Sequence, residues 1–591
     1  MYKRLFALFP LTAVAVAVGV ALTGCDGDDA APPAPKILSF TAVSTPVTDA
    51  EKRLVNSSRK IELNGKRYDI AYNTIMRSGD KVGTGVFGQL YDIAGNVIKN
   101  TDGSPFISNS NDHSSLLDVY GKLFMVSQFE DRVGMNYVTE LKQDAATGKL
   151  TPVSTKPVDN SGIGGTWVHC AGSRTPWKTH LGSEEYEPNA ADPNLNDNSY
   201  YKGLAPYFGG DITKANPYNY GFITEATITG ADMGTGTFAS NVKYVKHYSM
   251  GRMAFELAYV MPNQKTAYMT DDGSYVGLFR FEADKAGDLG SGKLYAAKVT
   301  QKDAANGGSF DLSWVDLGAA NDAEIKTFID AKKTFADIFD KGDVASCPAD
   351  YKLTVTSPGA ECLKVKPGME KIASRLETRR YAAMLGATTE FNKEEGITFD
   401  AESNRLFVAM SFIDGGMLDN AATKKENAKA VNFNHIRLPK NACGTVYALD
   451  LDANYVAKNM YGLVSGKPAT YPAGDQYAGN TCDVNNIANP DNVTFFPGYS
   501  TLVIGEDTGT GHQNDAIWSY HLNSKALTRI FTTPYGSETT SPYVYQNIYG
   551  WGYMMGVVQH PYGESDTDKA VTGSPERRAY TGYFGPFPKL D

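Results

Sequence analysis

Short runs of apolar and β-branched residues, separated by turn residues, recur along the chain from residue 49 to residue 591. The runs are rich in Val, Thr, Tyr and Phe, and the segments between them are rich in Gly, Pro, Asn and Asp. This pattern is typical of many short β-strands that are connected by tight turns. Because the pattern does not change over these residues, we expect a single, mainly β domain over 49–591.

The pattern contains an internal repeat of strand, turn and strand, and the units begin with a residue that can bind a metal. Such units begin at Glu256, Glu395 and Asp491. A second polar residue follows 15 positions later, at Asp271 in the first of these units and at Glu506 in the third. The same step joins Glu395 to Met410 (beside Ser411), Ser115 to Glu130, and Cys170 to Glu185.

A hairpin that is repeated around an axis predicts a β-propeller, and we expect six blades. The two ends of each hairpin would then lie at the same end of a central channel. The side chains expected to converge there are Cys170, Glu184, Glu185, Glu256, Asp271, Asp272, Glu395, Asp491 and Glu506. So many carboxylates would repel one another without cations, which favours bound metal. The alternative is that these acids are turn residues that face solvent.

Two segments depart from the β pattern. Ala323–Lys341 has apolar residues at near-helical spacing, with acids early and lysines late. Pro367–Gly386 has a proline at its start and apolar residues on one side. Together with the segment between them, which contains Cys347 and Cys362, they predict a small helical, disulfide-containing insertion at about 318–386.

The N-terminus has the form of a bacterial lipoprotein signal. Two basic residues precede the apolar stretch Leu11–Leu22, and small residues then precede Cys25. We therefore expect a signal peptide over 1–24, a lipid on Cys25 and a flexible tether over 25–48. The alternative, a transmembrane anchor, needs about 20 apolar residues. The predicted location is the bacterial cell envelope, with the protein lipid-anchored to a membrane and facing the periplasm or the cell surface.

Charge and cysteine count narrow the choice of partners. The chain has 66 acidic and 56 basic residues and a formal net charge of −10, which argues against nucleic acid as a partner. Cysteines of exported proteins tend to pair, and we expect two disulfides, Cys347–Cys362 and Cys443–Cys482. Cys170 is left over, either as a buried inert thiol or as a metal ligand. We further expect the protein to be a monomer.

The segment Gly165–Pro188 resembles the signature of the PhoX family of bacterial alkaline phosphatases. It reads GTWVHCAGSRTPWKTHLGSEEYEP, and in the family a Trp, a Cys, a Thr-Pro-Trp and a Glu-Glu recur in this order. Later segments also follow the family order: GRMAFELAYV, YMTDDG, EEGITF, NPDNVTF, GEDTG, ETTSP and VQHP. The resemblance implies a β-propeller with an active site of ferric iron and calcium. It also implies a metal-dependent phosphatase that hydrolyses phosphate monoesters outside the cytoplasm.

Carried over residue by residue, the resemblance makes Cys170 the thiolate that binds iron. The carboxylates that would hold the ions are Glu185 or Glu184, Glu256, Asp271 or Asp272, Glu395, and Asp491. Thiolate and carboxylate suit iron, whereas surroundings of oxygen alone suit calcium. Two basic residues are candidates for contact with the phosphate ester, Lys393 and Arg174. Arg174 could equally pair with a nearby acid, and His560 is either a site residue or a packed strand end.

Three features depart from the family pattern. Lys393 stands where relatives often have Arg, the run GRMAFE lacks a His that many relatives carry next to the Glu, and a lipoprotein signal replaces a twin-arginine signal. Two alternatives to a phosphomonoesterase therefore stay open. One is a phosphodiesterase-type hydrolase that uses the same metal cluster, and the other is a non-catalytic, calcium-binding lipoprotein propeller.

Overall fold

The computed structural model describes residues 36–419 and 434–590. The signal peptide expected over 1–24, the lipid expected on Cys25 and the first part of the expected tether lie outside these residues. Regular structure begins inside the segment expected to be tether, because β1 (Leu38–Phe40) pairs with β3 (Lys60–Leu63). From Ile37 onward the chain forms one compact unit. Within the described residues, no helix is long and apolar enough to cross a membrane.

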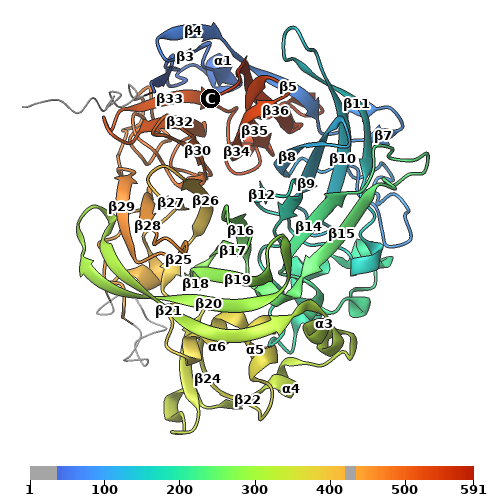
Figure 1. The fold of residues 1–591 in the computed structure, drawn as a ribbon, viewed down its shortest axis with the longest axis vertical. Coiled ribbons are helices and arrows are strands. Elements are labelled where there is room, and N and C mark those ends of the chain that lie inside the picture. The colour runs from blue at the N-terminus through green and yellow to red at the C-terminus, as the bar shows by residue number, and fades with distance from the viewer. Residues whose placement is uncertain (1–35, 420–433, 591) are drawn as a thin grey trace, which may run out of the picture. The chain divides into compact units, whose positions relative to one another are not determined.

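Six antiparallel blades of four strands surround a central axis in the described part of the chain (Figure 1). The first blade consists of β8 (Asn111–Val119), β9 (Lys122–Phe129), β10 (Met135–Gln143) and β11 (Leu150–Pro157). The second blade consists of β12 (Gly172–Arg174), β13 (His180–Gly182), β14 (Ile223–Ile228) and β15 (Val242–His247). The third blade consists of β16 (Phe255–Val260), β17 (Thr266–Asp271), β19 (Phe279–Lys285) and β20 (Asp288–Asp303). The fourth blade consists of β26 (Glu394–Asp400), β27 (Arg405–Met410), β28 (Thr445–Asp450) and β29 (Asn459–Ser465). The fifth blade consists of β30 (Pro490–Phe496), β31 (Thr501–Glu506), β32 (Ala516–His521) and β33 (Leu527–Thr532). The sixth blade consists of β34 (Glu538–Ile548), β35 (Trp551–Gln559), β36 (Tyr580–Pro588) and β5 (Ala71–Arg77).

The ring of blades is closed. Each inner strand contacts the next, in the order β8, β12, β16, β26, β30 and β34, and β34 contacts β8. The sixth blade combines the two ends of the domain, because β5 pairs with β36 in an antiparallel arrangement. A further strand, β21 (Ser309–Asn321), pairs with β20 and β29 and so joins the third and fourth blades at their outer edges. The expected six-bladed β-propeller is therefore confirmed.

The core lies between the faces of neighbouring blades. Inner strands such as β26 and β30 are buried along their whole length, because a blade packs against a neighbour on each side. Between the fourth and fifth blades, for example, the rings of Phe407 and Phe495 stack with their centroids 5.9 Å apart. Burying such aromatic and β-branched side chains from both blades is the main stabilising contribution to this architecture.

The insertion between the third and fourth blades is confirmed, with a change in its elements (Figure 1). It consists of α3 (Asp322–Asp330), α4 (Phe335–Ile338), α5 (Glu370–Leu376), α6 (Thr378–Met384) and the sheet of β22 (Phe339–Gly342), β24 (Gly359–Val365) and β23 (Lys352–Thr356). The helix expected over Ala323–Lys341 is split, because Lys332 has a φ of +52° and Thr334 starts a new helix with a capping box. The second expected helix breaks at Glu377.

The cysteines pair as expected. The structure contains the disulfides Cys347–Cys362 and Cys443–Cys482, and among the described residues Cys170 is the free cysteine. Short elements complete the domain: β2 (Asn56–Ser57), β4 (Lys66–Asp69), β6 (Lys81–Val82), β7 (Gly85–Val86), β18 (Ser274–Val276), β25 (Phe391–Asn392), α1 (Asp49–Lys52) and α2 (Ser199–Lys202).

Candidate metal centre

Among the described residues, five of the six inner strands contain a β-bulge, and in four of them the bulge begins with an acid near the same end of the channel. In β16, pairing with β17 shifts between Phe255 and Ala258, and equivalent shifts occur in β8, β26 and β30. A bulge leaves a residue without a partner and redirects its side chain. In all four strands the first residue of the bulge is an acid: Asp112, Glu256, Glu395 and Asp491.

In these hairpins, the residue directly after the end of the second strand places its side chain in the channel. Asp272 follows β17, Asp507 follows β31, Glu130 follows β9 and His560 follows β35. In the third and fifth blades this residue lies 16 positions after the bulge acid, one more than the 15-residue step of the repeat. Because neighbouring positions of a strand point to opposite faces, this single position decides which side chain enters the channel.

These strand ends enclose a cavity of about 350 Å³ at one end of the channel. Every blade contributes to its lining, which contains nine acidic side chains and one lysine. The lining residues are Ser110, Glu130, Cys170, Glu185, Tyr186, Glu256, Asp272, Lys393, Glu395, Asp491, Asp507, Glu538, His560 and Glu564.

Two groups of side chains in this cavity have the spacing of metal ligands. Ligand atoms of Cys170, Glu185 and Glu256 lie within 4.8 Å of one another, and the same holds for Glu256, Glu395 and Asp491. The first group combines a thiol with carboxylates, and the second offers oxygen alone. Glu256 belongs to both groups, so the two positions share a carboxylate.

Neighbouring side chains fix the orientation of these ligands. The Asn492 amide donates a hydrogen bond to Glu256 Oε1 at 2.9 Å, and the Ser411 hydroxyl donates to Glu395 Oε1 at 2.6 Å. Gly396 allows the inner strands of two blades to approach closely, because a Cβ there would lie 2.7 Å from the Cα of Asn492. Such outer partners typically hold metal ligands in a productive geometry.

The cavity concentrates negative charge. Burial and the charges of surrounding carboxylates raise the pKa values of Glu185, Glu256 and Asp491 well above their usual range. The same causes raise the pKa of Glu395 to about 7 and that of the Cys170 thiol well above its ordinary value. Cations bound among these groups would remove the repulsion and favour their ionised forms. The donor set therefore fits metal ions.

Among the described residues that line the cavity, Lys393 is the one cation. Its Nζ lies 2.8 Å from Asp272 Oδ2 and 3.4 Å from Glu395 Oε1. Burial would raise the pKa of Asp272, but the charge of Lys393 together with hydrogen bonds from Glu185, Lys393 and Tyr186 outweighs burial and lowers this pKa to about 2. The Tyr186 hydroxyl also donates to Asp272 Oδ2 at 2.6 Å. Lys393 therefore lies among the candidate ligands, where the sequence analysis expected it.

Glu184, Asp271 and Glu506 do not line the cavity, contrary to expectation. Glu184 forms a fully buried ion pair with Lys246, with Oε1 and Nζ 2.8 Å apart, and accepts hydrogen bonds from backbone N–H groups. Asp271 is paired with Arg379, and Glu506 contacts His512. These three acids point away from the channel because each directly precedes the residue that faces it.

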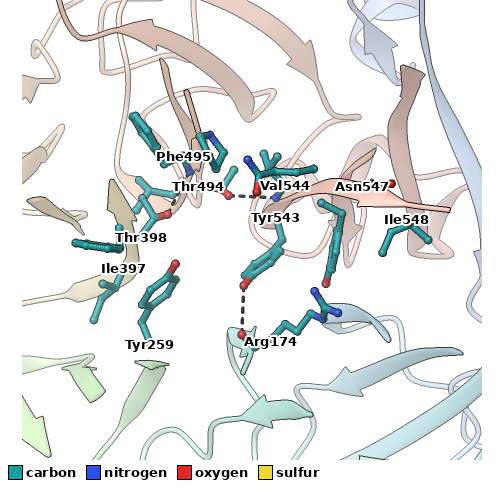
Figure 2. Close-up of a pocket in the computed structure, with 15 residues that line it drawn as sticks. Arg174, Tyr259, Ile397, Thr398, Thr494, Phe495, Tyr543, Val544, Asn547 and Ile548 are labelled. Atoms are coloured by element: carbon teal, nitrogen blue, oxygen red, sulfur yellow. Dashed lines mark hydrogen bonds between the residues drawn. The ribbon is translucent and has the colours of Figure 1, made fainter. Parts of the chain in front are cut away.

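Arg174 is also outside the metal cavity, which corrects its expected place in the active site. It lines a second cavity of about 330 Å³ with Tyr259, Thr494 and Tyr543 (Figure 2). Asp491 lines the first cavity and Thr494 the second, three residues or about 10 Å further along β30. The guanidinium pairs with Asp118 at 2.5 Å. Of the two interpretations of Arg174, the ion pair is the one observed.

Several lining residues were not among those predicted from the sequence. They are Ser110, Tyr186, Asp507, Glu538 and Glu564, whereas Glu130 was noted only as the end of a repeat unit. The segments GEDTG and ETTSP, already noted, contain Asp507 and Glu538, and a 16-residue step would have selected Asp507. His560 lies in the cavity, with Nε2 3.2 Å from Glu538 Oε2, so its interpretation as a site residue agrees with the geometry.

The fold and the cavity together define a β-propeller protein with a carboxylate-rich metal centre. The sequence matches the family model for alkaline phosphatase PhoX over residues 121–545. Because the match covers more than half of the chain, the protein belongs to the PhoX family, and it is a metal-dependent phosphatase. No curated protein matches this chain.

The structure is similar to that of Pseudomonas fluorescens PhoX in complex with vanadate, a transition state analogue. The TM-score is 0.58 at 14% sequence identity, over 93% of this chain and 98% of that chain, and the likeness shows a shared fold. Weaker likenesses include a putative 6-phosphogluconolactonase from Bacteroides uniformis (TM-score 0.28, 9% identity, 85% of this chain and 98% of that chain). Another is Trypanosoma rangeli sialidase (TM-score 0.33, 8% identity, 87% and 58%). These two carry no argument about function.

Proposed function

We propose that the protein hydrolyses phosphate monoesters outside the cytoplasm, with iron and calcium in the cavity described above and a lipid anchor on Cys25. The observation that carries this proposal is the pair of ligand groups that share Glu256, next to Lys393. Cys170, Glu185 and Glu256 would hold iron, because a thiolate suits iron and is a poor ligand for calcium. Glu256, Glu395 and Asp491 would hold calcium.

The metal ions would supply positive charge that neutralises the phosphoryl oxygens and so stabilises the transition state. The protein's own residues bind and orient the ester. Lys393 is poised to contact a phosphoryl oxygen, and its ion pairs with Asp272 and Glu395 hold the ammonium at the cavity wall. Burial lowers the pKa of His560, so a neutral imidazole stands beside Glu538.

The decisive experiment combines metal analysis with activity. We expect the purified protein to contain iron and calcium and to release phosphate from an aryl phosphate monoester faster than from the matching diester. Cys170→Ser should lose iron, keep both disulfides and lower kcat/KM by more than about 100-fold, because even outer partners of metal ligands are worth 10–100-fold. Arg174→Gln is the matched control, and its activity should equal that of the wild type.

Each alternative has its own outcome. Faster hydrolysis of the diester would favour a phosphodiesterase, and calcium without iron or activity would favour a non-catalytic propeller. Full activity of Cys170→Ser would overturn the assignment of Cys170 as an iron ligand.

A further inference from the structure

Two neighbouring arginines on α6 of the insertion are buried and doubly ion-paired, but the carboxylates that bind Arg379 lie outside the insertion, whereas those that bind Arg380 lie inside it. Arg379 binds Asp271 with Nε 2.7 Å from Oδ2 and Nη2 2.9 Å from Oδ1. It also binds Glu187, with Nη1 2.7 Å from Oε1 and Nη2 2.8 Å from Oε2. Arg380 instead contacts Glu377 and Glu361, which belong to the insertion, and Asn189.

The two carboxylates held by Arg379 flank candidate ligands from different blades. Asp271 directly precedes Asp272, which lines the cavity in the third blade. Glu187 lies two residues after Glu185 and one after Tyr186, which line the cavity beside the second blade. Arg379 does not line the cavity itself. Arg379 therefore connects, from outside the cavity, two segments that carry candidate metal ligands.

The same network reaches the ligand shared by both groups. Asp271 Oδ1 accepts a hydrogen bond from the backbone N–H of Ala254 at 3.2 Å, and the Asp272 N–H donates to the Ala254 carbonyl at 2.8 Å. Ala254 is two residues before Glu256. The orientation of the Asp271 carboxylate is thus coupled to the start of β16, where the bulge places Glu256 in the cavity.

The geometry points to Arg379 as a positioning residue of the metal centre. The planar guanidinium holds Glu187 and Asp271 at a fixed separation, a task that an ammonium with a single point of charge does not perform. We infer that the insertion sets the affinity of the cavity for metal ions through this arginine. The inference rests on the proposed function, because it requires the cavity to bind cations.

The test compares Arg379→Lys with Arg380→Lys, which is a matched change at the next position of α6. Calcium affinity is measured by titration calorimetry of the metal-depleted protein, and stability by urea denaturation in chelator. We expect Arg379→Lys to weaken calcium binding by about 10-fold or more, in line with the loss of other outer partners of metal sites. We expect the calcium Kd of Arg380→Lys to stay within twofold of the wild-type value, even where its stability falls as much as that of Arg379→Lys.

A second variant tests the inference if Arg379→Lys does not fold. Glu187→Gln removes one carboxylate of the bridge, keeps the size of the side chain and leaves the pair of Arg379 with Asp271. It should weaken calcium binding in the same direction. Wild-type calcium affinity in Arg379→Lys or in Glu187→Gln would overturn the inference but not the proposed function. A loss of calcium affinity in Arg380→Lys equal to that in Arg379→Lys would do the same. A wild-type protein that binds no cation would overturn the proposed metal centre, and this inference with it.

Discussion

Single residues at the cavity adopt backbone conformations that side chains rarely favour. Lys393 has a φ of +53°, and Tyr186 and His560 also have positive φ values. For residues other than glycine such conformations cost about 1 kcal/mol or more, and they occur where the surrounding structure demands them. At Lys393 the demand comes from the backbone, because its N–H donates to the Gly273 carbonyl at 2.7 Å and brings the side chain to Asp272.

The role of Lys393 can be measured. If its ammonium contacts the phosphoryl group, Lys393→Ala should lower kcat/KM on an aryl phosphate by about 10²-fold, equivalent to about 2.7 kcal/mol. Lys393→Arg should keep or improve activity, because it restores a two-pronged contact. Steady-state kinetics of both variants decide the matter. A Lys393→Ala enzyme within about twofold of the wild type would remove Lys393 from the active site.

At the level of elements, buried ion pairs connect the insertion to the blades. His247, the last residue of β15, lies with Nε2 2.9 Å from Glu225 Oε2 and Nδ1 3.4 Å from Asp322 Oδ2, at the start of α3. Burial alone would lower the pKa of His247, but hydrogen bonds and charges of these two acids raise it to about 9. The imidazolium therefore holds α3 against the second blade at neutral pH.

This contact predicts a loss of stability in alkaline solution. The pKa of His247 is higher in the folded state than its unfolded value of about 6.5, so its stabilisation is complete below pH 6.5 and is lost as the pH rises through about 9. The loss for this group is up to about 3 kcal/mol. We expect urea denaturation between pH 6 and 9, at saturating calcium, to show a flatter pH dependence for His247→Gln than for the wild type.

A second substitution isolates the cause. Glu225→Gln removes one of the two acids and so lowers the pKa of His247 in the folded state, and the loss of stability in that variant should be smaller and should end at a lower pH than in the wild type. An unchanged pH dependence in both variants would contradict the assignment of a charged His247.

At the level of the whole molecule, the closed ring makes the cavity a meeting point of all six blades. Strand β5 from the N-terminal part pairs with β36 near the C-terminus, so the last blade forms only when both ends are in place. The acids of the cavity come from every blade and repel one another without cations. Metal binding and the stability of the ring should therefore be coupled.

Removal of calcium tests this coupling. A chelator should abolish activity and lower the Tm, and added calcium should restore both, because ions that bind only the folded state stabilise it by mass action. At a free calcium concentration 100 times the Kd, a single site contributes about 2.7 kcal/mol. Differential scanning calorimetry at several calcium concentrations measures the effect. A Tm and an activity that survive exhaustive chelation would contradict a metal centre formed by these acids.

Local sequence patterns were sufficient for much of the architecture. Strand-turn-strand units, the insertion and both disulfides are visible in the chain, since hairpins and their turns depend on residues close in sequence. The repeat also located Cys170, Glu185, Glu256, Glu395 and Asp491, all of which line the cavity, whereas its 15-residue step selected Asp271 in place of Asp272. These residues stand at strand ends, and a propeller brings such ends together whatever the details of packing.

Tertiary structure alone decided which of two neighbouring acids enters the channel. Asp272 lines the cavity while Asp271 binds Arg379, and Glu185 lines it while Glu184 binds Lys246. The choice depends on bulges in the inner strands and on partners far away in the chain, neither of which leaves a local pattern. A shift of one residue turns a side chain to the opposite face of its strand, so only the folded backbone settles the ligand set.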